Sequence, residues 1–380
     1  MATRSCDVLI VGGGPAGSAC ARQLARAGLD VLIIDKQEFP RDKVCAGWIT
    51  PAVVESLELD CAEYSNGRVM QPICGFRTGI IGGTPVETQY PHVASFGIRR
   101  REFDDYLLRR SGARLRLGPP LRDLVREDGT WRVNGDISTP LVVVAGGHFC
   151  PVARAIGARH ATEKSAAVET IIAAQEIEFP LTHEQRSECR INNGMVDLYF
   201  CADLKGYGWC FAKGNYLNIG LGREDNRRLP EHVEQFHRWL QLRGDIPRHL
   251  PGKFAGHAYL SYPASHRPLV SDGVILIGDA AGLAYPQSGE GILPAVESGL
   301  LAAQAILGAA GDYRAHKLEA YSAQLTARYG ARSGPGIPRA ANAPWPRLAQ
   351  AFRQVLARPL LSSTWFVRHV VMDRWFLHAN

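Results

Sequence analysis

Residues 7–17 read DVLIVGGGPAG, an uninterrupted apolar run followed at once by a cluster of glycines. Val8–Val11 show no alternation of apolar and polar side chains, which is typical of a strand buried on both faces of a parallel sheet. A helical pattern then extends to Gly28, and a second apolar run, Val31–Ile34, ends at Asp35. The order strand, glycine turn, helix and strand predicts a βαβ unit.

The glycines of this unit have the spacing G-x-G-x-x-G, at Gly12, Gly14 and Gly17. The first allows the tight turn, the second lets a pyrophosphate approach the backbone, and the third lets the helix pack on the strand. The positive end of the helix would face the phosphates. Asp35 stands where a carboxylate holds the adenosine ribose. The pattern predicts a dinucleotide site, without distinguishing FAD from NAD.

Composition limits the class of protein. The 380 residues suffice for roughly two domains, and 46% hydrophobic with 21% charged residues is ordinary for a globular chain. The net charge of +6 is compatible with anionic ligands but too weak to indicate nucleic acid. The nine cysteines are irregularly spaced without a CxxC pair, which argues against disulfides or a metal site and favours a reducing compartment. The first residues lead directly into a strand, so we expect a cytoplasmic protein.

A second block follows another buried strand, Val274–Ile277, and reads GDAAGLAYPQSGEG over residues 278–291. Asp279, held between small residues, can accept a hydrogen bond from a sugar-alcohol hydroxyl. The glycines would admit a flat ring against the backbone. The helix that begins near Gly291 could stabilise negative charge on a reduced isoalloxazine ring. This block therefore favours FAD.

Together the two motifs resemble those of the FAD-dependent enzymes of the para-hydroxybenzoate hydroxylase fold, a group that includes aromatic hydroxylases, flavin-dependent halogenases and geranylgeranyl reductases. The resemblance covers residues 1–310 in scattered blocks. Residues 99–104, RRREFD, resemble the family's arginine-bearing helix beside the cofactor, and we expect Arg99 to pair with phosphate or the ribityl region. Residues 142–154 resemble the strand ending in ADGxxSxxR. There Gly146 replaces the acid and Cys150 the serine, which puts the usual nicotinamide docking in doubt.

Two further blocks resemble the geranylgeranyl reductase branch. RDKVCAGW, residues 41–48, is similar to its RxKxCGG, and GYGWCFAKGNYLNIGLG, residues 206–222, to its GYxWxFPKxxxxNxGxG. The GWxWxIP block of halogenases is absent. The resemblance implies that the residues holding FAD include Gly12, Gly14, Pro15, Ala16, Gly17, Asp35, Lys36, Lys43, Cys45, Ala46, Arg99, Gly278, Asp279, Ala280, Pro286, Gly289, Gly291 and Ile292.

The resemblance also places Cys45, Tyr207 and Trp209 at the catalytic centre. A thiol can line a dry pocket and donate a proton where a hydride adds to a carbon–carbon double bond. The alternative is that Cys45 is a small buried hydrophobe. Tyr207 and Trp209 would be walls of the substrate cavity, or one face of a core strand. His257 has no spacing that marks a ligand, and a core or solvated position is expected.

We expect an α/β chain, α+β overall, in which a Rossmann-like FAD-binding domain carries an inserted antiparallel substrate sheet and a C-terminal helical region. We expect the FAD-binding domain at 1–72, 95–165 and 265–312, and the substrate sheet at 73–94 and 166–264. The C-terminal helical region would span 313–380. Apolar triplets recur every five residues in the tail from residue 362, which gives no single stripe on an α-helix. The tail is either a helix docked on the body or an anchor at a membrane surface.

The expected activity is FAD-dependent reduction, or dehydrogenation, of a carbon–carbon double bond in an apolar, isoprenoid-like or lipid substrate, by hydride transfer at flavin N5. The sequence has no second Rossmann fingerprint, so NAD(P)H visits transiently or a separate donor protein supplies electrons. One alternative is a monooxygenase that hydroxylates a small or carrier-bound substrate through a flavin hydroperoxide. A third is a flavin-binding electron relay. The fold permits all three.

Overall fold

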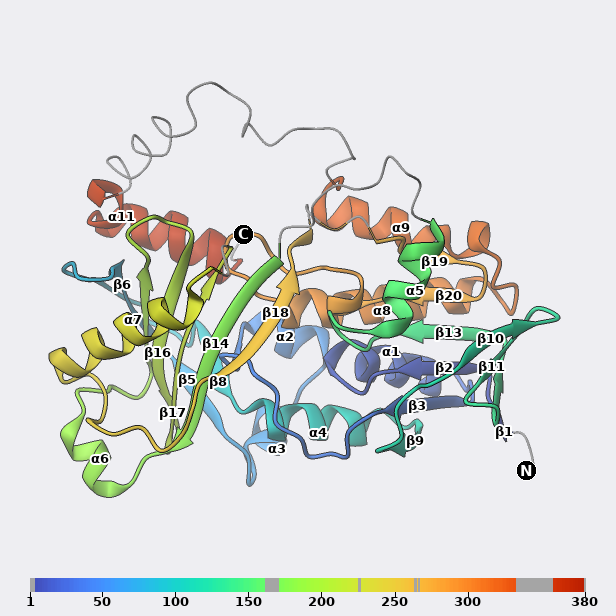
Figure 1. Cartoon of the computed structure of the whole chain (residues 1–380), viewed down its shortest axis with the longest axis horizontal. Helices are drawn as coiled ribbons and strands as arrows, with labels where there is room; N and C mark the ends of the chain where they lie inside the picture. The colour runs from blue at the N-terminus through green and yellow to red at the C-terminus, as the bar shows by residue number, and fades with distance from the viewer. Residues whose placement is uncertain are drawn as a thin grey trace.

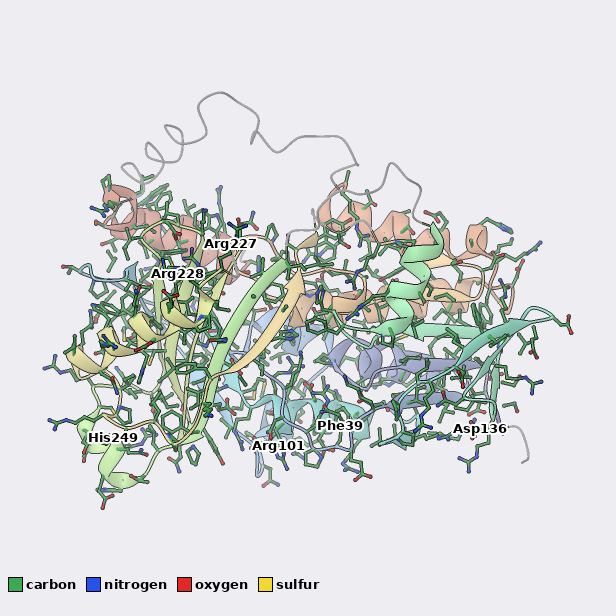
Figure 2. All side chains as sticks on the ribbon, viewed as in Figure 1. Phe39, Arg101, Asp136, Arg227, Arg228 and His249 are labelled. Carbon is green, nitrogen blue, oxygen red and sulfur yellow. The ribbon has the colours of Figure 1, made fainter. Side chains whose placement is uncertain are left out.

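A computed structural model describes residues 4–160, 171–224, 227–262, 265, 267–332 and 358–378. The molecule is elongated, with a six-stranded sheet toward one end and a seven-stranded sheet toward the other (Figure 1). Side chains fill the space between the sheets and their helices, while the exposed Arg101 and Arg228 lie on the outside (Figure 2). The described chain therefore has the mixed α/β architecture that the sequence predicts.

The six-stranded sheet has the strand order β19-β20-β13-β2-β3-β9. Five strands are parallel, and only the edge strand β19 runs against its neighbour. All four residues of β2 are buried, as an uninterrupted apolar strand between helical layers requires. The bounds are β2 Val8–Val11, β3 Val31–Asp35, β9 Arg114–Leu117, β13 Leu141–Val144, β19 Val270–Ser271 and β20 Val274–Leu276.

Strand order explains how the two sequence motifs meet. Strand β13 lies between β2 and β20, with Val144 paired to both Val11 and Leu276. The carboxyl ends of these three strands therefore lie side by side, and ligands of open α/β sheets bind at that edge. Helices packed on this sheet include α1 Pro15–Arg26, α4 Arg100–Arg110, α5 Pro151–His160, α8 Ile292–Gly308 and α9 Ala315–Tyr329.

The seven-stranded sheet has the order β18-β14-β17-β16-β15-β6-β7. The expectation of an antiparallel sheet is correct for every pair except β6 with β15, which is parallel. Strand β6 comes from an earlier part of the chain and joins the edge of the later strands, so no tight turn forces the two to run in opposite directions. The bounds are β6 Gly75–Ile80, β7 Val86–Gln89, β14 Ile171–Pro180, β15 Met195–Phe200, β16 Gly206–Lys213, β17 Tyr216–Arg223 and β18 Ala255–Leu260.

Smaller elements complete the body. Strands β4 Trp48–Ile49, β8 Ser95–Ile98 and β5 Met70–Ile73 form a small sheet that begins directly after the Cys45 loop. Helix α7 spans Leu229–Arg243 and buries Val233, Phe236 and Leu240 in the cluster that also holds residues of β14–β17. The remaining elements are β1 Arg4–Ser5, β10 Leu124–Glu127, β11 Thr130–Val133, β12 Ile137–Thr139, α2 Pro51–Ser56, α3 Cys61–Ser65, α6 His183–Glu188 and η3 Gly278–Ala280.

The C-terminal tail docks on the seven-stranded sheet. Helix α11, Thr364–Phe366, continues into η5, Val367–Phe376, whose wide turns have π geometry. In that geometry residues four and five apart share a face. Val367, Val371, Met372 and Phe376 thus form one buried stripe, in a cluster with Phe76 and others from the sheet. The five-residue spacing, which gives no stripe on an α-helix, gives one here.

Among the residues that the structure describes, no helix combines the length and the apolar character needed to cross a bilayer. The predicted domain boundaries remain predictions, and the segments 161–170 and 333–357, which lie near or within them, fall outside the described residues.

Candidate active site

A cavity of about 1060 Å³ is lined by residues of both large sheets and of the C-terminal tail. It collects most of the residues that the sequence singled out, although they come from widely separated parts of the chain. The predicted site residues on its wall are Gly12, Gly14, Pro15, Ala16, Asp35, Lys36, Lys43, Cys45, Ala46, Tyr207, Trp209, Asp279, Pro286, Gly289, Gly291 and Ile292. Gly17, Arg99, Gly278 and Ala280 are not on that wall.

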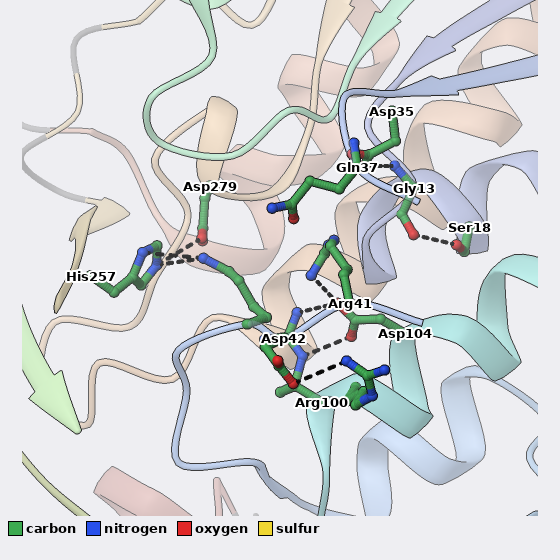
Figure 3. A network of polar contacts seen from close by, with 12 residues as sticks. Gly13, Ser18, Asp35, Gln37, Arg41, Asp42, Arg100, Asp104, His257 and Asp279 are labelled. Atoms are coloured by element: carbon green, nitrogen blue, oxygen red, sulfur yellow. Dashed lines mark hydrogen bonds and ion pairs between the residues drawn. The ribbon is translucent and has the colours of Figure 1, made fainter. Parts of the chain in front are cut away.

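The three motif glycines have different surroundings. A Cβ added at Gly17 would lie 2.0 Å from the carbonyl oxygen of Gly12, so Gly17 serves helix packing behind the cavity. Gly12 itself has φ +114°. A Cβ at Gly14 would meet nothing nearer than Arg41, at 3.7 Å, so this backbone is open to a ligand. Asp35 accepts hydrogen bonds from Gly13 N at 2.9 Å and Gln37 N at 3.0 Å, which fixes its carboxylate beside the turn (Figure 3).

Two arginines stand near the glycine turn, and neither is Arg99. Arg100 donates to both oxygens of the buried Asp104, at 2.7 and 2.8 Å, and Arg41 lies 3.2 Å from the same carboxylate (Figure 3). Both arginines line the cavity. Arg99 instead turns to Glu178 and Glu102, with its guanidinium over Tyr216. The expectation for Arg99 is therefore corrected, because adjacent residues at a helix start point in different directions.

A second polar group gathers around Asp279. Nζ of Lys43 lies 3.1 Å from the imidazole nitrogens of His257, and His257 Nε2 lies 3.8 Å from the Asp279 carboxylate (Figure 3). Burial alone would raise the pKa of Asp279, but the hydrogen bond and charge of His257 with the charges of Lys43 and Arg100 lower it. Asp279 is thus an ionised acceptor. His257, for which the sequence offered no signal, belongs to this group.

Three observations show that these residues fit FAD. Gly14 leaves the backbone open where a pyrophosphate would approach. Arg41 lines the cavity and its Nη2 is the atom nearest to a Cβ at Gly14, so this guanidinium can offer donors to an anion at the glycine turn. Asp279 supplies an ionised acceptor at the end of β20 for sugar hydroxyls. In bound FAD, Arg41 would contact the phosphates, Asp35 the adenosine ribose and Asp279 the ribityl chain.

The strand end that follows β13 departs from the family pattern. A Cβ added at Gly146 would lie 2.8 Å from the buried Sγ of Cys150. An acidic side chain at this position would therefore collide with the thiol that replaces the family's serine. Gly146 in place of the acid and Cys150 in place of the serine are therefore linked by packing.

The loop that carries Cys45 is fastened to the seven-stranded sheet at two points. Glu176 Oε1 accepts a hydrogen bond from Cys45 N at 2.5 Å. Nζ of Lys213, which is fully buried, donates to Ala46 O at 2.8 Å and to Ile98 O at 3.0 Å, and forms an ion pair with Glu178. Cys45 is partly buried on the cavity wall, and its Sγ accepts from Gly47 N at 3.4 Å. The sheet therefore sets the position of the thiol.

Tyr207 and Trp209 form aromatic walls, as predicted, and also pack into the sheet. The Trp209 ring covers Gly220, where a Cβ would lie 2.2 Å from the ring, and its Nε1 donates to Asn218 Oδ1 at 2.7 Å. The Tyr207 hydroxyl donates to the carbonyl of Ser288. The two residues thus lie both on the cavity wall and in a strand of the sheet, and their part in catalysis stays a prediction.

The C-terminal tail also reaches the cavity, which could not be predicted from the sequence. The tail residues on the cavity wall are Leu360, Leu361, Phe366, Trp375 and Phe376. Phe376 stacks on Trp48 at 5.6 Å between ring centroids and meets Tyr207 edge to face at 5.2 Å. The apolar part of the cavity therefore lies between the sheet and the tail.

Comparisons with known proteins agree with this geometry. The family model described as FAD dependent oxidoreductase matches residues 7–81. A menaquinone reductase of Mycobacterium tuberculosis is 33% identical over 324 residues, which cover 79% of this chain and 76% of that protein. Digeranylgeranylglycerophospholipid reductase 1 of Methanothermobacter thermautotrophicus is 28% identical, covering 83% and 81% of the two chains.

A solved structure shares the fold. The geranylgeranyl bacteriochlorophyll reductase-like protein from Thermoplasma acidophilum superimposes with a TM-score of 0.72 at 21% identity, over 95% of this chain and 88% of that one. Fold and site thus define an FAD-dependent oxidoreductase. Within that class, the chain belongs to the geranylgeranyl reductase family.

Proposed function

We propose that this enzyme reduces a carbon–carbon double bond in an apolar, polyprenyl-type substrate. The observation that carries the proposal is the continuity of one cavity, which runs from the glycine turn and Asp279 to an apolar chamber lined by Trp48, Tyr207 and the tail. Such a chamber suits a long hydrocarbon chain, because apolar surface leaves water most favourably against apolar walls. The names of the relatives, a menaquinone reductase and a digeranylgeranylglycerophospholipid reductase, support this substrate class.

The residues of the chain have separable roles in this proposal. Bound FAD supplies the hydride once it has been reduced. Trp209, fixed by Asn218, and Tyr207, fixed by Ser288, are rigid walls that orient the substrate and exclude water. Cys45 stands on the loop that joins the cofactor side to the substrate side, and its thiol borders the site of reduction.

The electron donor is NAD(P)H or a separate reductase protein. The position of the family's strand-end acid is closed by Cys150, which favours a donor that does not depend on that acid. Delivery of a lipid substrate also requires access from a membrane surface. Trp365 is 66% exposed and Leu360 44%, next to tail residues that line the cavity, so we propose peripheral contact through this tail.

The test is a product analysis under anaerobic conditions. Purified enzyme is reduced with dithionite, separated from the excess reductant and mixed with a polyprenyl naphthoquinone, and the product is examined by mass spectrometry and absorbance. We expect the product to gain two hydrogens and to retain the quinone absorbance, because the enzyme reduces the polyprenyl chain and not the quinone ring. Loss of that absorbance would indicate ring reduction, and a gain of one oxygen in air would indicate a monooxygenase. Either result would refute the proposal.

Cys45→Ala examines the role of the thiol in the same assay. We expect the variant to keep its FAD, because the glycine turn and Asp279 are untouched. It should reduce substrate at least about tenfold more slowly, because removing the side chain changes the wall that orients the substrate. Cys61→Ala is the matched control, since Cys61 is also partly buried but lies on α3 away from the cavity. Unchanged turnover in Cys45→Ala would make the thiol a packing residue.

A further inference from the structure

One acidic side chain in the cavity is not used by the proposed function. Glu176 lies on β14, is 6% exposed and contributes to the cavity wall. It pairs across the sheet with Gly220, the residue covered by the Trp209 ring, and its Oε1 accepts from the backbone of Cys45. The carboxyl group therefore stands where the two predicted catalytic elements meet, although these elements lie far from it in the sequence.

The two oxygens of Glu176 are not equivalent. Oε1 is committed as an acceptor, at 2.5 Å from Cys45 N. Oε2 is buried and has no hydrogen-bond partner among the residues that the structure describes. A buried polar atom without a partner is costly, more so when it is charged than when it is neutral, and a ligand that supplies the missing hydrogen bond removes the cost. A proton on this carboxyl group would reside on Oε2, since Oε1 already accepts.

A comparison with Glu178 shows why the pKa of Glu176 is raised. The two carboxyl groups share one face of β14, because they are two residues apart on a strand. Glu178 forms ion pairs with Lys213 and Arg99, whose combined effect outweighs burial and lowers its pKa. Burial raises the pKa of Glu176 to about 7, against the opposing effects of the Lys213 charge, the Cys45 amide and Asn218. Environments that separate two such groups are typical of acid–base sites.

We propose that Glu176 is the acid that delivers the proton during substrate reduction, with Oε2 as the donor atom. The inference rests on the proposed function. Reduction of a double bond adds a hydride to one carbon and a proton to the other. The hydride comes from flavin that a nicotinamide or a donor protein has reduced, and the proton leaves Oε2 as the O–H bond breaks. The Glu176 carboxylate then regains a proton from water.

The hydroxyl of Tyr207, which also borders the cavity, is less suited to this step. The Tyr207 hydroxyl is already donated to Ser288 O, and burial raises its pKa well above the ordinary value, which makes it a weak acid at neutral pH. A general acid is most effective when its pKa lies near the working pH. Glu176 meets that condition, while Cys45 provides the backbone amide that holds Glu176 in place.

The experiment compares Glu176→Gln with the matched control Glu184→Gln, an exposed residue of α6. Gln keeps an oxygen that can accept from Cys45 N, but it has no acidic proton. The prereduced holoenzymes are mixed with a polyprenyl quinone, and single-turnover rates are followed across pH. We expect Glu176→Gln to be about 100-fold slower. Flavin content and reduction by dithionite should be unchanged, and Glu184→Gln should match the wild type.

Two further readouts separate proton transfer from a structural role. The wild-type rate should fall as pH rises through about 7, and the rate of Glu176→Gln should not depend on pH in this range. Infrared spectra should show a carboxylic acid carbonyl band that disappears over the same range and is missing from Glu176→Gln. An absent band, or Glu176→Gln with the wild-type rate, would overturn the inference. If the wild-type enzyme fails to reduce the polyprenyl chain of the quinone, that result counts against the proposed function instead.

Discussion

Replacing Lys213 with Met should loosen the attachment of the Cys45 loop and destabilise the fold. The Lys213 side chain is fully buried. Its Nζ donates hydrogen bonds to Ala46 O and Ile98 O and forms an ion pair with the Glu178 carboxylate. Methionine fills a similar volume, so the change removes a charge and its donors without opening a large cavity. The predicted effect therefore reports on the polar contacts and not on packing.

The size of the effect follows from the groups that are left behind. Removing one partner of a buried ion pair costs about 3–5 kcal/mol, and each stranded acceptor costs about 1–3 kcal/mol. Glu178 keeps two donors, Arg99 Nε at 3.1 Å and Asn218 Nδ2 at 3.4 Å. Because the carboxylate is still partly satisfied, we place the loss near the lower limit, at about 3 kcal/mol.

The assay is denaturant unfolding of the FAD-free and FAD-bound protein, followed by tryptophan fluorescence and circular dichroism. The double variant Lys213→Met with Glu178→Met should recover much of the loss, because neither member of the pair is then left alone. Lys253→Met, at an exposed position, is the matched control. A Lys213→Met protein whose stability is within about 1 kcal/mol of the wild type would refute the reasoning.

Three further predictions concern the cofactor site and the buried acid. Arg41→Gln should weaken FAD binding about tenfold while Arg99→Gln leaves it unchanged, measured by flavin fluorescence titration, and equal effects would reject the assignment. Gly17→Ala should abolish FAD retention and Gly14→Ala should reduce it only partly, judged from the flavin absorbance of purified protein. Glu176 has a folded-state pKa of about 7, above its ordinary 4.5, so the wild type loses stability as pH rises between these values. The Glu176→Gln variant avoids this loss, so at pH above 7 its free energy of unfolding should exceed that of the wild type by up to about 3 kcal/mol. Parallel pH profiles of the two proteins in denaturant unfolding would contradict this prediction.

The cofactor side of the site could be predicted from the sequence because its determinants are local. A turn that must pass close to a helix requires glycine at a fixed spacing, and the contact between Gly17 and Gly12 shows that requirement directly. Asp35 is the last residue of strand β3, and there its carboxylate accepts a hydrogen bond from the backbone N–H of Gly13 in the glycine turn. Asp279 likewise lies directly after a buried strand. In each case the ligand-facing group lies within a few residues of a recognisable strand end.

The side chains that complete the site could not be chosen from the sequence. Arg99 and Arg100 are neighbours, and only the rotation of helix α4 about its axis decides that Arg100 faces the cavity. Glu176 and Glu178 are alternate residues of one strand with the same side chain. Lys213, from another strand, reaches Glu178 and leaves Glu176 without an ion pair among the described residues. Spacing alone contains no information about which carboxylate would be left unpaired.

The sequence by itself determined the cofactor class, the strand ends that hold it and the identity of the reductase-like blocks, since these depend on short-range backbone geometry. Tertiary structure decided what surrounds the substrate. The tail from Leu360 to Phe376 closes a cavity whose other walls come from residues 11–295. It does so through a helix whose wide turns bring its apolar residues to one face. Contacts between such distant segments depend on the packing of the whole chain, which no local pattern encodes.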